Sequence, residues 1–276
     1  MVAPFPLAIS TSVFARAFSP AHIDALDEST VDGVEIVGPS PQCPFDQPDV
    51  ADALRARFRD ARVRLHSVHL PYGSKLDVSQ SDDALRAAAL SQTEANLRTA
   101  AALGARLMVV HPSAEPIADE ERAARLDASR RSLATLTATA ADLGVRLAVE
   151  CLPRSCLGHT AVELLSIVDD LDPRVTGVCI DANHLNLRDD LAAGVRTLGR
   201  RLFTLHCSEN DGIDERHWLP GSAGGVIDWN AFLGALRDVR YAGPFLYELR
   251  TLDLDVPSTL RAIEDNYRGL IANAEA

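Results

Sequence analysis

Six apolar stretches of this chain each run into a residue that can bind a divalent cation. The stretches read VRLHSVHL, ARLMVVHP, VRLAVECL, VTGVCIDANH, RLFTLHCSEN and GPFLYELR, and segments typical of helices separate them. Their ligand residues are His69, His111, Glu150, Asp181, His206 and Glu248. Imidazole nitrogens and carboxylate oxygens together suit a hard or borderline divalent cation. If the six ends meet in the fold, the pattern indicates a metal enzyme.

The last four of these residues form the set best suited to a single ion. Glu150, Asp181, His206 and Glu248 end four consecutive strand-like stretches. Three carboxylates and one imidazole offer an oxygen-rich, roughly octahedral site for Mn²⁺, Mg²⁺, Co²⁺ or Zn²⁺. One such residue alone is more often an ordinary polar residue at a strand end, but four in succession favour a metal site.

Three further histidines allow two interpretations each. His69 and His111 are followed closely by Pro71 and Pro112, where the chain turns. Each of these histidines is either a packed, hydrogen-bonded residue or a ligand for a metal or a phosphate. His184 follows Asp181 by three residues, so it either caps a turn or binds a second metal or a substrate oxygen.

The segment HCSENDGIDERHWLPGSAGGVIDW is the richest in residues that could do chemistry. Glu215 and His217 lie in a long loop, residues 207–228, that ends in glycine-rich turns, and Asp228 has the features of a helix N-cap. Surface acidity would explain the charges, but it does not explain a histidine beside Trp218. We expect this loop to cover the active face of the protein.

Strand periodicity suggests where three more polar side chains point. Glu35 in GVEIV alternates with Val34 and Ile36, so it can point into the protein interior beside the ligands. Arg250 follows Glu248 by two residues and can hold an anionic or hydroxylated substrate, although a surface salt bridge is an equally good interpretation. His66 has the opposite parity to His69, so we expect it to face the helix layer.

Eight strand-like stretches alternate with helix-like segments along the whole chain. The strands are expected at residues 6–11, 33–37, 63–69, 106–111, 145–151, 175–181, 202–206 and 245–249. Gly104 and Gly144 stand where two long helical segments should stop. This order predicts one α/β domain over residues 1–276, a (β/α)8 TIM barrel. A doubly wound sheet is the competing fold, but it would gather its site at one switch point rather than on so many strands.

Composition excludes several classes of function. The formal net charge of −12 over 276 residues argues against broad capture of nucleic acid, which is not expected as a partner. The five cysteines, without close pairing, suit packed thiols in a reduced compartment. Neither a signal peptide nor a membrane-spanning stretch is visible, so a cytoplasmic location is expected. No Walker loop, GxGxxG or GxSxG motif is present.

The motifs VECLP, CIDANH, the loop HCSEN to VIDW, and ELR together resemble the xylose-isomerase-like barrel superfamily, over nearly the whole chain. The resemblance implies that Glu150, Asp181, His206 and Glu248 hold one divalent cation. It also implies that the two glutamates are catalytic and move protons on opposite faces of a small carbohydrate. His184, Arg250 and Glu35 are the expected substrate-binding residues.

The same superfamily includes the endonuclease IV type of enzyme, which carries three zinc ions. Its extra ligands match His69, His111, His184 and His217, with Glu215 where that type has aspartate. Phosphodiester cleavage is therefore the alternative function. Against it, the DNA enzymes have a glycine-glutamine-glycine turn where this chain has CLPRSCLGHT, and the chain is strongly acidic. One ion is expected and up to three are allowed, and the oligomeric state stays open, a homo-oligomer included.

The leading expectation is a metal-dependent sugar, sugar phosphate or polyol isomerase or epimerase. Removing a proton beside a carbonyl leaves an enediolate, and a divalent cation stabilises the charge on its oxygens. Two carboxylates on well-separated strands can then take a proton and return it.

Overall fold

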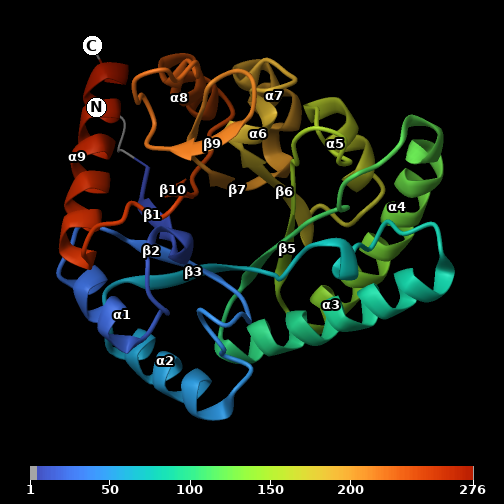
Figure 1. Ribbon diagram of the computed structural model, residues 1–276, viewed down its shortest axis with the longest axis horizontal. Helices are drawn as coiled ribbons and strands as arrows, with labels where there is room; N and C mark the ends of the chain where they lie inside the picture. The colour runs from blue at the N-terminus through green and yellow to red at the C-terminus, as the bar shows by residue number, and fades with distance from the viewer. Residues whose placement is uncertain (1–4, 276) are drawn as a thin grey trace.

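Eight parallel strands close into a barrel in the computed structural model, which describes residues 5–275 (Figure 1). Neighbouring strands follow the order β10-β1-β2-β3-β4-β5-β6-β7, and a parallel bridge between Cys207 and Tyr247 joins the end of β7 to β10. The strands are β1 Leu7–Ser10, β2 Gly33–Val37, β3 Arg64–His69, β4 Leu107–Val110, β5 Arg146–Glu150, β6 Thr176–Asp181, β7 Leu202–His206 and β10 Phe245–Tyr247. All eight expected strands are therefore confirmed.

Helices surround the barrel as an outer layer (Figure 1). They are α1 Pro20–Asp27, α2 Pro48–Asp60, α3 Asp83–Leu103, α4 Asp119–Leu143, α5 Ala161–Val168, α7 Leu191–Leu198, α8 Trp229–Asp238 and α9 Val256–Glu275. The short helix α6 Ala182–Leu185 is buried and directly follows the end of β6. The fold is the predicted single α/β barrel. None of the described helices is both long and apolar enough to cross a lipid bilayer.

The helix boundaries follow from the local sequence. The Asp82 carboxylate accepts the backbone N–H groups of Ala84 and Leu85 and so caps the start of α3. Gly104 and Gly144 stop α3 and α4 in the left-handed conformation, with φ of 109° and 67°. Each glycine turns the chain directly into the next strand, β4 or β5, and thereby sets where that strand begins.

Alternate residues of the strands fill the barrel interior. Leu107, Val109, Ala148 and Cys179 form a small buried cluster, with Phe203 packed against it. All five cysteines are buried and free, as expected for packed thiols.

A β-bulge in β3 changes the direction of one predicted side chain. Val34 pairs with Leu65 but Glu35 pairs with Ser67, so His66 is an extra residue in the strand. The extra residue cancels the simple alternation that the sequence prediction assumed. The expectation that His66 faces the helices was wrong, because its Nε2 lies 3.0 Å from Thr204 Oγ1 on β7, across the barrel.

The long segment after β7 has secondary structure of its own. It contains a short antiparallel pair, β8 Glu209–Asn210 and β9 Glu215–Trp218, which the sequence did not predict. Asp228 caps α8 as expected, since its carboxylate accepts the N–H of Ala231.

Candidate metal centre

The strand ends bring the four principal ligand candidates together. Donor atoms of Glu150, Asp181, His206 and Glu248 all lie within 4.8 Å of one another. His206 Nδ1 lies 3.1 Å from Glu150 Oε1 and 3.2 Å from Glu248 Oε2, so it stands between the two glutamates. The convergence of residues up to 98 positions apart in the chain follows from parallel strands ending at one face of a barrel.

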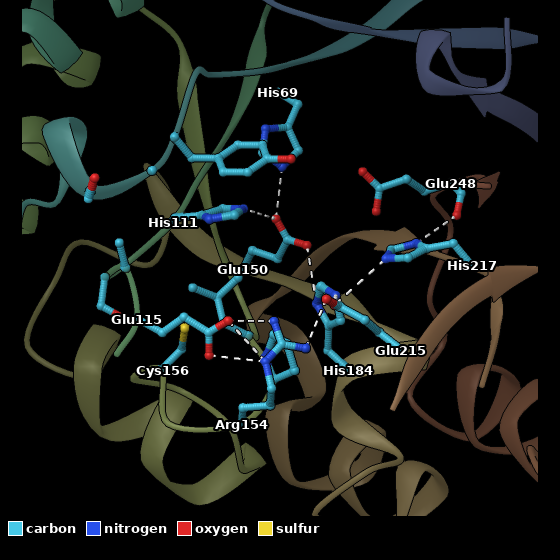
Figure 2. A pocket seen from close by; sticks show the side chains of 17 residues that line it. His69, His111, Glu115, Glu150, Arg154, Cys156, His184, Glu215, His217 and Glu248 are labelled. Carbon is cyan, nitrogen blue, oxygen red and sulfur yellow. Dashed lines mark hydrogen bonds and ion pairs between the residues drawn. The ribbon is translucent and has the colours of Figure 1, made fainter. Parts of the chain in front are cut away.

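Two further groups of donors lie beside this set and line one cavity together with Glu248 (Figure 2). Asp181 and His206 are completely buried and do not line this cavity. In the first, Glu150 Oε2 lies 3.0 Å from His69 Nε2 and 3.1 Å from His111 Nε2. In the second, Glu215 Oε2 lies 2.8 Å from His184 Nε2 and 3.7 Å from His217 Nε2. A fourth group, His69 with His206 and Glu248, overlaps the others. Every histidine and carboxylate that the sequence suggested as a ligand therefore lies in at least one of four groups.

The pKa values in this centre report an excess of negative charge. Burial alone would lower the pKa of a histidine, but Glu150 raises the pKa of His69 to about 9. In the same way, burial opposes but Asp181 and Glu215 raise the pKa of His184 to about 10. Burial also raises the pKa of Asp181 itself, to about 6. A cation bound among these groups would neutralise this negative charge.

A divalent cation fits the set of Glu150, Asp181, His206 and Glu248. Asp181 Oδ2 is buried and has no hydrogen-bond partner among residues 5–275. No arginine or lysine in the described part of the chain pairs with the three carboxylates of this set. An orphaned buried oxygen beside two further carboxylates is costly unless a cation neutralises it.

The remaining predicted site residues lie outside the cavity that the ligands line. Glu35 does point into the barrel, as expected, but it is completely buried beneath His206, with Oε1 3.0 Å from His206 Nε2. Ser67 donates a 2.7 Å hydrogen bond to its other oxygen. Arg250 is exposed, and it is not among the residues that line the cavity. Its backbone N–H donates to His217 O.

The cavity has a volume of about 400 Å³ and includes residues that the sequence did not single out. The Tyr72 ring stacks on His111, with ring centres 4.2 Å apart and planes inclined by 21°. Arg154, with a left-handed φ of 53°, donates hydrogen bonds to Glu115 and Glu215 (Figure 2). It also donates one to Asp214 and so ties three loops together. These residues come from loops without periodicity, so no sequence pattern marked them.

Glu209 was also not distinguished from its acidic neighbours, although it organises the loop over the site. The carboxylate is buried and accepts the backbone N–H groups of Gly221, Val226 and Ile227 and the indole N–H of Trp229. A carboxylate with this many donors fixes the loop path from β9 to α8. In the sequence, only its position after Ser208 in the family motif HCSEN distinguished Glu209 from the other acidic residues of the loop.

Comparison with known proteins identifies the family. A family model described as xylose isomerase-like TIM barrel matches residues 23–269, most of the chain. The chain belongs to the xylose isomerase-like TIM barrel family. The resemblance expected from the motifs is thus confirmed.

Relatives within this family include sugar epimerases at low identity. An uncharacterized protein of Methanocaldococcus jannaschii is 27% identical over 191 residues, 67% of this chain and 64% of that protein. The D-psicose 3-epimerase of Agrobacterium fabrum is 31% identical over 110 residues, 39% of this chain and 36% of that enzyme. The alignments thus span less than two thirds of these two relatives. A ketose 3-epimerase of Arthrobacter globiformis is 23% identical, over 71% of this chain and 68% of that enzyme.

Solved structures share the whole xylose isomerase-like barrel. A D-tagatose 3-epimerase-like protein superposes with a TM-score of 0.81 at 23% identity, over 98% of this chain and 100% of that one. A D-psicose 3-epimerase from Clostridium cellulolyticum H10, solved with D-tagatose, gives 0.79 at 20% identity, over 98% of both chains. At this identity the likeness establishes the fold.

Proposed function

We propose that this protein is a divalent-metal-dependent isomerase or epimerase of a small ketose or related polyol. One observation carries the proposal: the carboxylates of Glu150 and Glu248, from β5 and the end of β10, both lie within 3.2 Å of the same His206 nitrogen. Two carboxylates on strands that are not neighbours can face a substrate from two sides. The cavity of about 400 Å³ lies near the lower end of the range for small-molecule sites, about 300–1,000 Å³.

The two glutamates supply the acid and base chemistry. Burial opposes ionisation of Glu248, but His206 lowers its pKa to about 2, so the group is a carboxylate at neutral pH. One glutamate removes the proton from the carbon beside the carbonyl, and the other returns a proton to the enediolate. Return to the opposite face of the same carbon gives an epimer, and return to the neighbouring carbon gives an isomer.

The other residues of the set position the reacting groups. His206 Nδ1 contacts both glutamates, at 3.1 Å from Glu150 Oε1 and 3.2 Å from Glu248 Oε2. His184 lines the cavity and is the residue we assign to a substrate oxygen. A bound Mn²⁺, Zn²⁺, Co²⁺ or Mg²⁺ would stabilise the negative charge that develops on the substrate's oxygens.

The relatives support a carbohydrate substrate. Three curated relatives are named D-psicose 3-epimerase, L-ribulose 3-epimerase and ketose 3-epimerase. A direct test is to incubate the purified protein and Mn²⁺ with a panel of ketoses in D₂O. We expect deuterium to enter at least one ketose at the carbon beside the carbonyl, and the Glu150→Gln protein to lose this exchange. Absence of exchange from the whole panel would refute the proposal.

A second candidate, phosphodiester cleavage, is favoured by the two additional ligand groups. His69 and His111 with Glu150, and His184 and His217 with Glu215, offer sites for two more cations. The two candidates separate on an oligonucleotide duplex with one abasic site. Cleavage beside the abasic site, together with three metal ions per chain, would favour the phosphodiesterase over the epimerase.

A further inference from the structure

A second cavity lies at the opposite end of the barrel from the metal centre. Its volume is about 970 Å³, and it is lined by the starts of β5 and β7, by residues before β10 and by His66 of the β3 bulge. We call it the basal cavity. Arg146 begins β5 and Glu150 ends it, so one five-residue strand, about 13 Å between these residues, connects the two sites.

Three arginines line this cavity, and none of them has a carboxylate partner within residues 5–275. Arg146, Arg200 and Arg240 form no ion pair and no side-chain hydrogen bond with any residue of that described range. Arg154 in the catalytic cavity, by contrast, is bound to three carboxylates. Asp238, which also lines the basal cavity, pairs with Arg196 at 2.9 Å. All three arginines are exposed, and together they place three positive charges at one cavity of a chain whose net charge is −12.

The backbone at Arg240 adds an independent observation. Arg240 follows the end of α8 with φ of 58°, a left-handed conformation that normally selects glycine. An arginine in this conformation is strained, and strained residues that line a cavity often have a functional role. Here the strained residue places a charged side chain on the cavity wall where glycine would fit the backbone better.

His66 and Phe203, which also line the basal cavity, are suited to a ligand as well. His66, half-buried, pairs with Thr204 through Nε2 at 3.0 Å, and burial lowers its pKa to about 4, so the ring is neutral at pH 7. The Arg146 guanidinium lies 4.7 Å from the centre of the Phe203 ring, which orients it. Guanidinium groups bind phosphate oxygens in a fixed, bidentate geometry.

We propose that the basal cavity binds a small molecule that carries phosphate groups, held by Arg146, Arg200 and Arg240. The site is separate from the metal centre and does not depend on the function proposed for it. Free inorganic phosphate and a phosphorylated metabolite share this chemistry. The cavity volume favours the larger ligand, because it lies at the upper end of the range for small-molecule sites.

Calorimetric titration of the metal-loaded full chain, at constant ionic strength, tests the proposal. The probes are inorganic phosphate and fructose 1,6-bisphosphate. We expect saturable binding of one bisphosphate per chain, weakened at least about tenfold in Arg146→Gln and in Arg240→Gly. Arg174→Gln, which removes an exposed arginine that pairs with Asp172, should change the affinity less than about twofold. If phosphate binds as tightly as the bisphosphate, the ligand is free phosphate.

Two further measurements distinguish anion binding in the basal cavity from anion binding at the metal centre and from a general loss of stability. Binding should persist in Glu150→Gln, whereas its loss there would locate the anion in the metal centre and overturn the proposal. Because Arg240→Gly relieves the left-handed strain, its melting temperature should rise by about 2 °C while its affinity for the anion falls. Unchanged affinity in both arginine variants, no saturation with either probe, or a loss of binding that only follows a loss of stability would each refute the site.

Discussion

Glu35 Oε1 lies 3.0 Å from His206 Nε2, and both side chains are completely buried. His206 Nδ1 faces the carboxylates of the metal centre, so the glutamate contacts the ring nitrogen on the other side. The two atoms meet at ion-pair distance but not in hydrogen-bond geometry, because both belong to the buried atoms that have no hydrogen-bond partner within residues 5–275. A buried carboxylate this close to the imidazole favours positive charge at His206 and so supports a cation bound beside it.

Replacing Glu35 with glutamine should therefore weaken metal binding without touching any proposed ligand. We expect the affinity for Mn²⁺ to fall about 10–100-fold, the usual effect of losing such a partner. Competition with a fluorescent chelator measures this affinity. The exposed Glu120→Gln serves as control and should bind Mn²⁺ as the unmodified protein does. Equal affinities for the two variants would mean that Glu35 does not support His206.

Glu248→Gln should lower turnover by at least about two orders of magnitude, because a positioned general base contributes about 10²–10⁴-fold. The rate of deuterium exchange into the responsive ketose gives this number. Arg250→Gln changes an exposed residue two positions along the chain, outside the cavity, and should alter the rate less than about twofold. A loss below about threefold in Glu248→Gln would remove this glutamate from the mechanism.

The number of bound ions can be assigned to individual ligand groups. Asp181→Asn removes a carboxylate from the principal set and should abolish the ion on which the proposed function depends. His217→Gln affects only the group formed with His184 and Glu215. The ion held by the principal set should therefore remain in this variant. Elemental analysis of each purified variant, with anomalous scattering from crystals, counts the ions per chain. An unchanged metal content in Asp181→Asn would contradict the assignment.

Gly225 should not tolerate a side chain, because the loop over the site packs against Glu209 there. A Cβ atom at Gly225 would lie 2.3 Å from the Glu209 carboxylate carbon, which five N–H donors hold in place. Gly225→Ala should lower the free energy of unfolding by about 1–3 kcal/mol in urea titrations. In Gly234→Ala the Cβ meets nothing within 4 Å inside α8, and stability should rise by about 0.5–1 kcal/mol. If Gly225→Ala were more stable than Gly234→Ala, the loop around Glu209 would be able to make room for a side chain.

His66 should make stability depend on pH below neutrality. Burial lowers its pKa in the folded protein to about 4 from 6.5, so between these values protons bind the unfolded chain and not the native one. The contribution of neutral His66 to the free energy of unfolding is therefore fully present above pH 6.5 and is lost as the pH falls towards 4. From pH 7 to pH 5 this group should cost about 2 kcal/mol of unfolding free energy.

The variant His66→Gln isolates this effect. Urea unfolding of both proteins at pH 5, 7 and 8 gives the comparison. The variant should lose less stability than the unmodified protein between pH 7 and 5, and the two should run parallel between pH 7 and 8. If both proteins lose the same stability down to pH 5, a group other than His66 takes up the proton on unfolding.

Much of the candidate metal centre was predictable, because a closed parallel barrel brings residues at the ends of separate strands to one face. A histidine or carboxylate at the end of an apolar stretch is visible in the sequence, and parallel strands of a closed barrel all end at one face. The family motifs then separated the four principal ligands from the others. Glu35 was predicted to point inward from simple alternation, and it does.

Features that depend on irregular backbone escaped prediction. His66 was assigned to the wrong side because one extra residue in β3 breaks the alternation. Tyr72 and Arg154 reach the cavity from loops whose paths depend on contacts with other loops.

The barrel, the approximate strand positions and the candidate metal ligands could be predicted from the amino-acid sequence, since periodicity, helix caps and strand-end residues are all local signals. How the candidate ligands divide into four overlapping groups, two of which share Glu150, depends on the tertiary structure. It also placed Arg250 and Glu35 outside the cavity and gathered three arginines at the far end of the barrel. These outcomes depend on distances between strands and loops far apart in the chain, which no local pattern encodes.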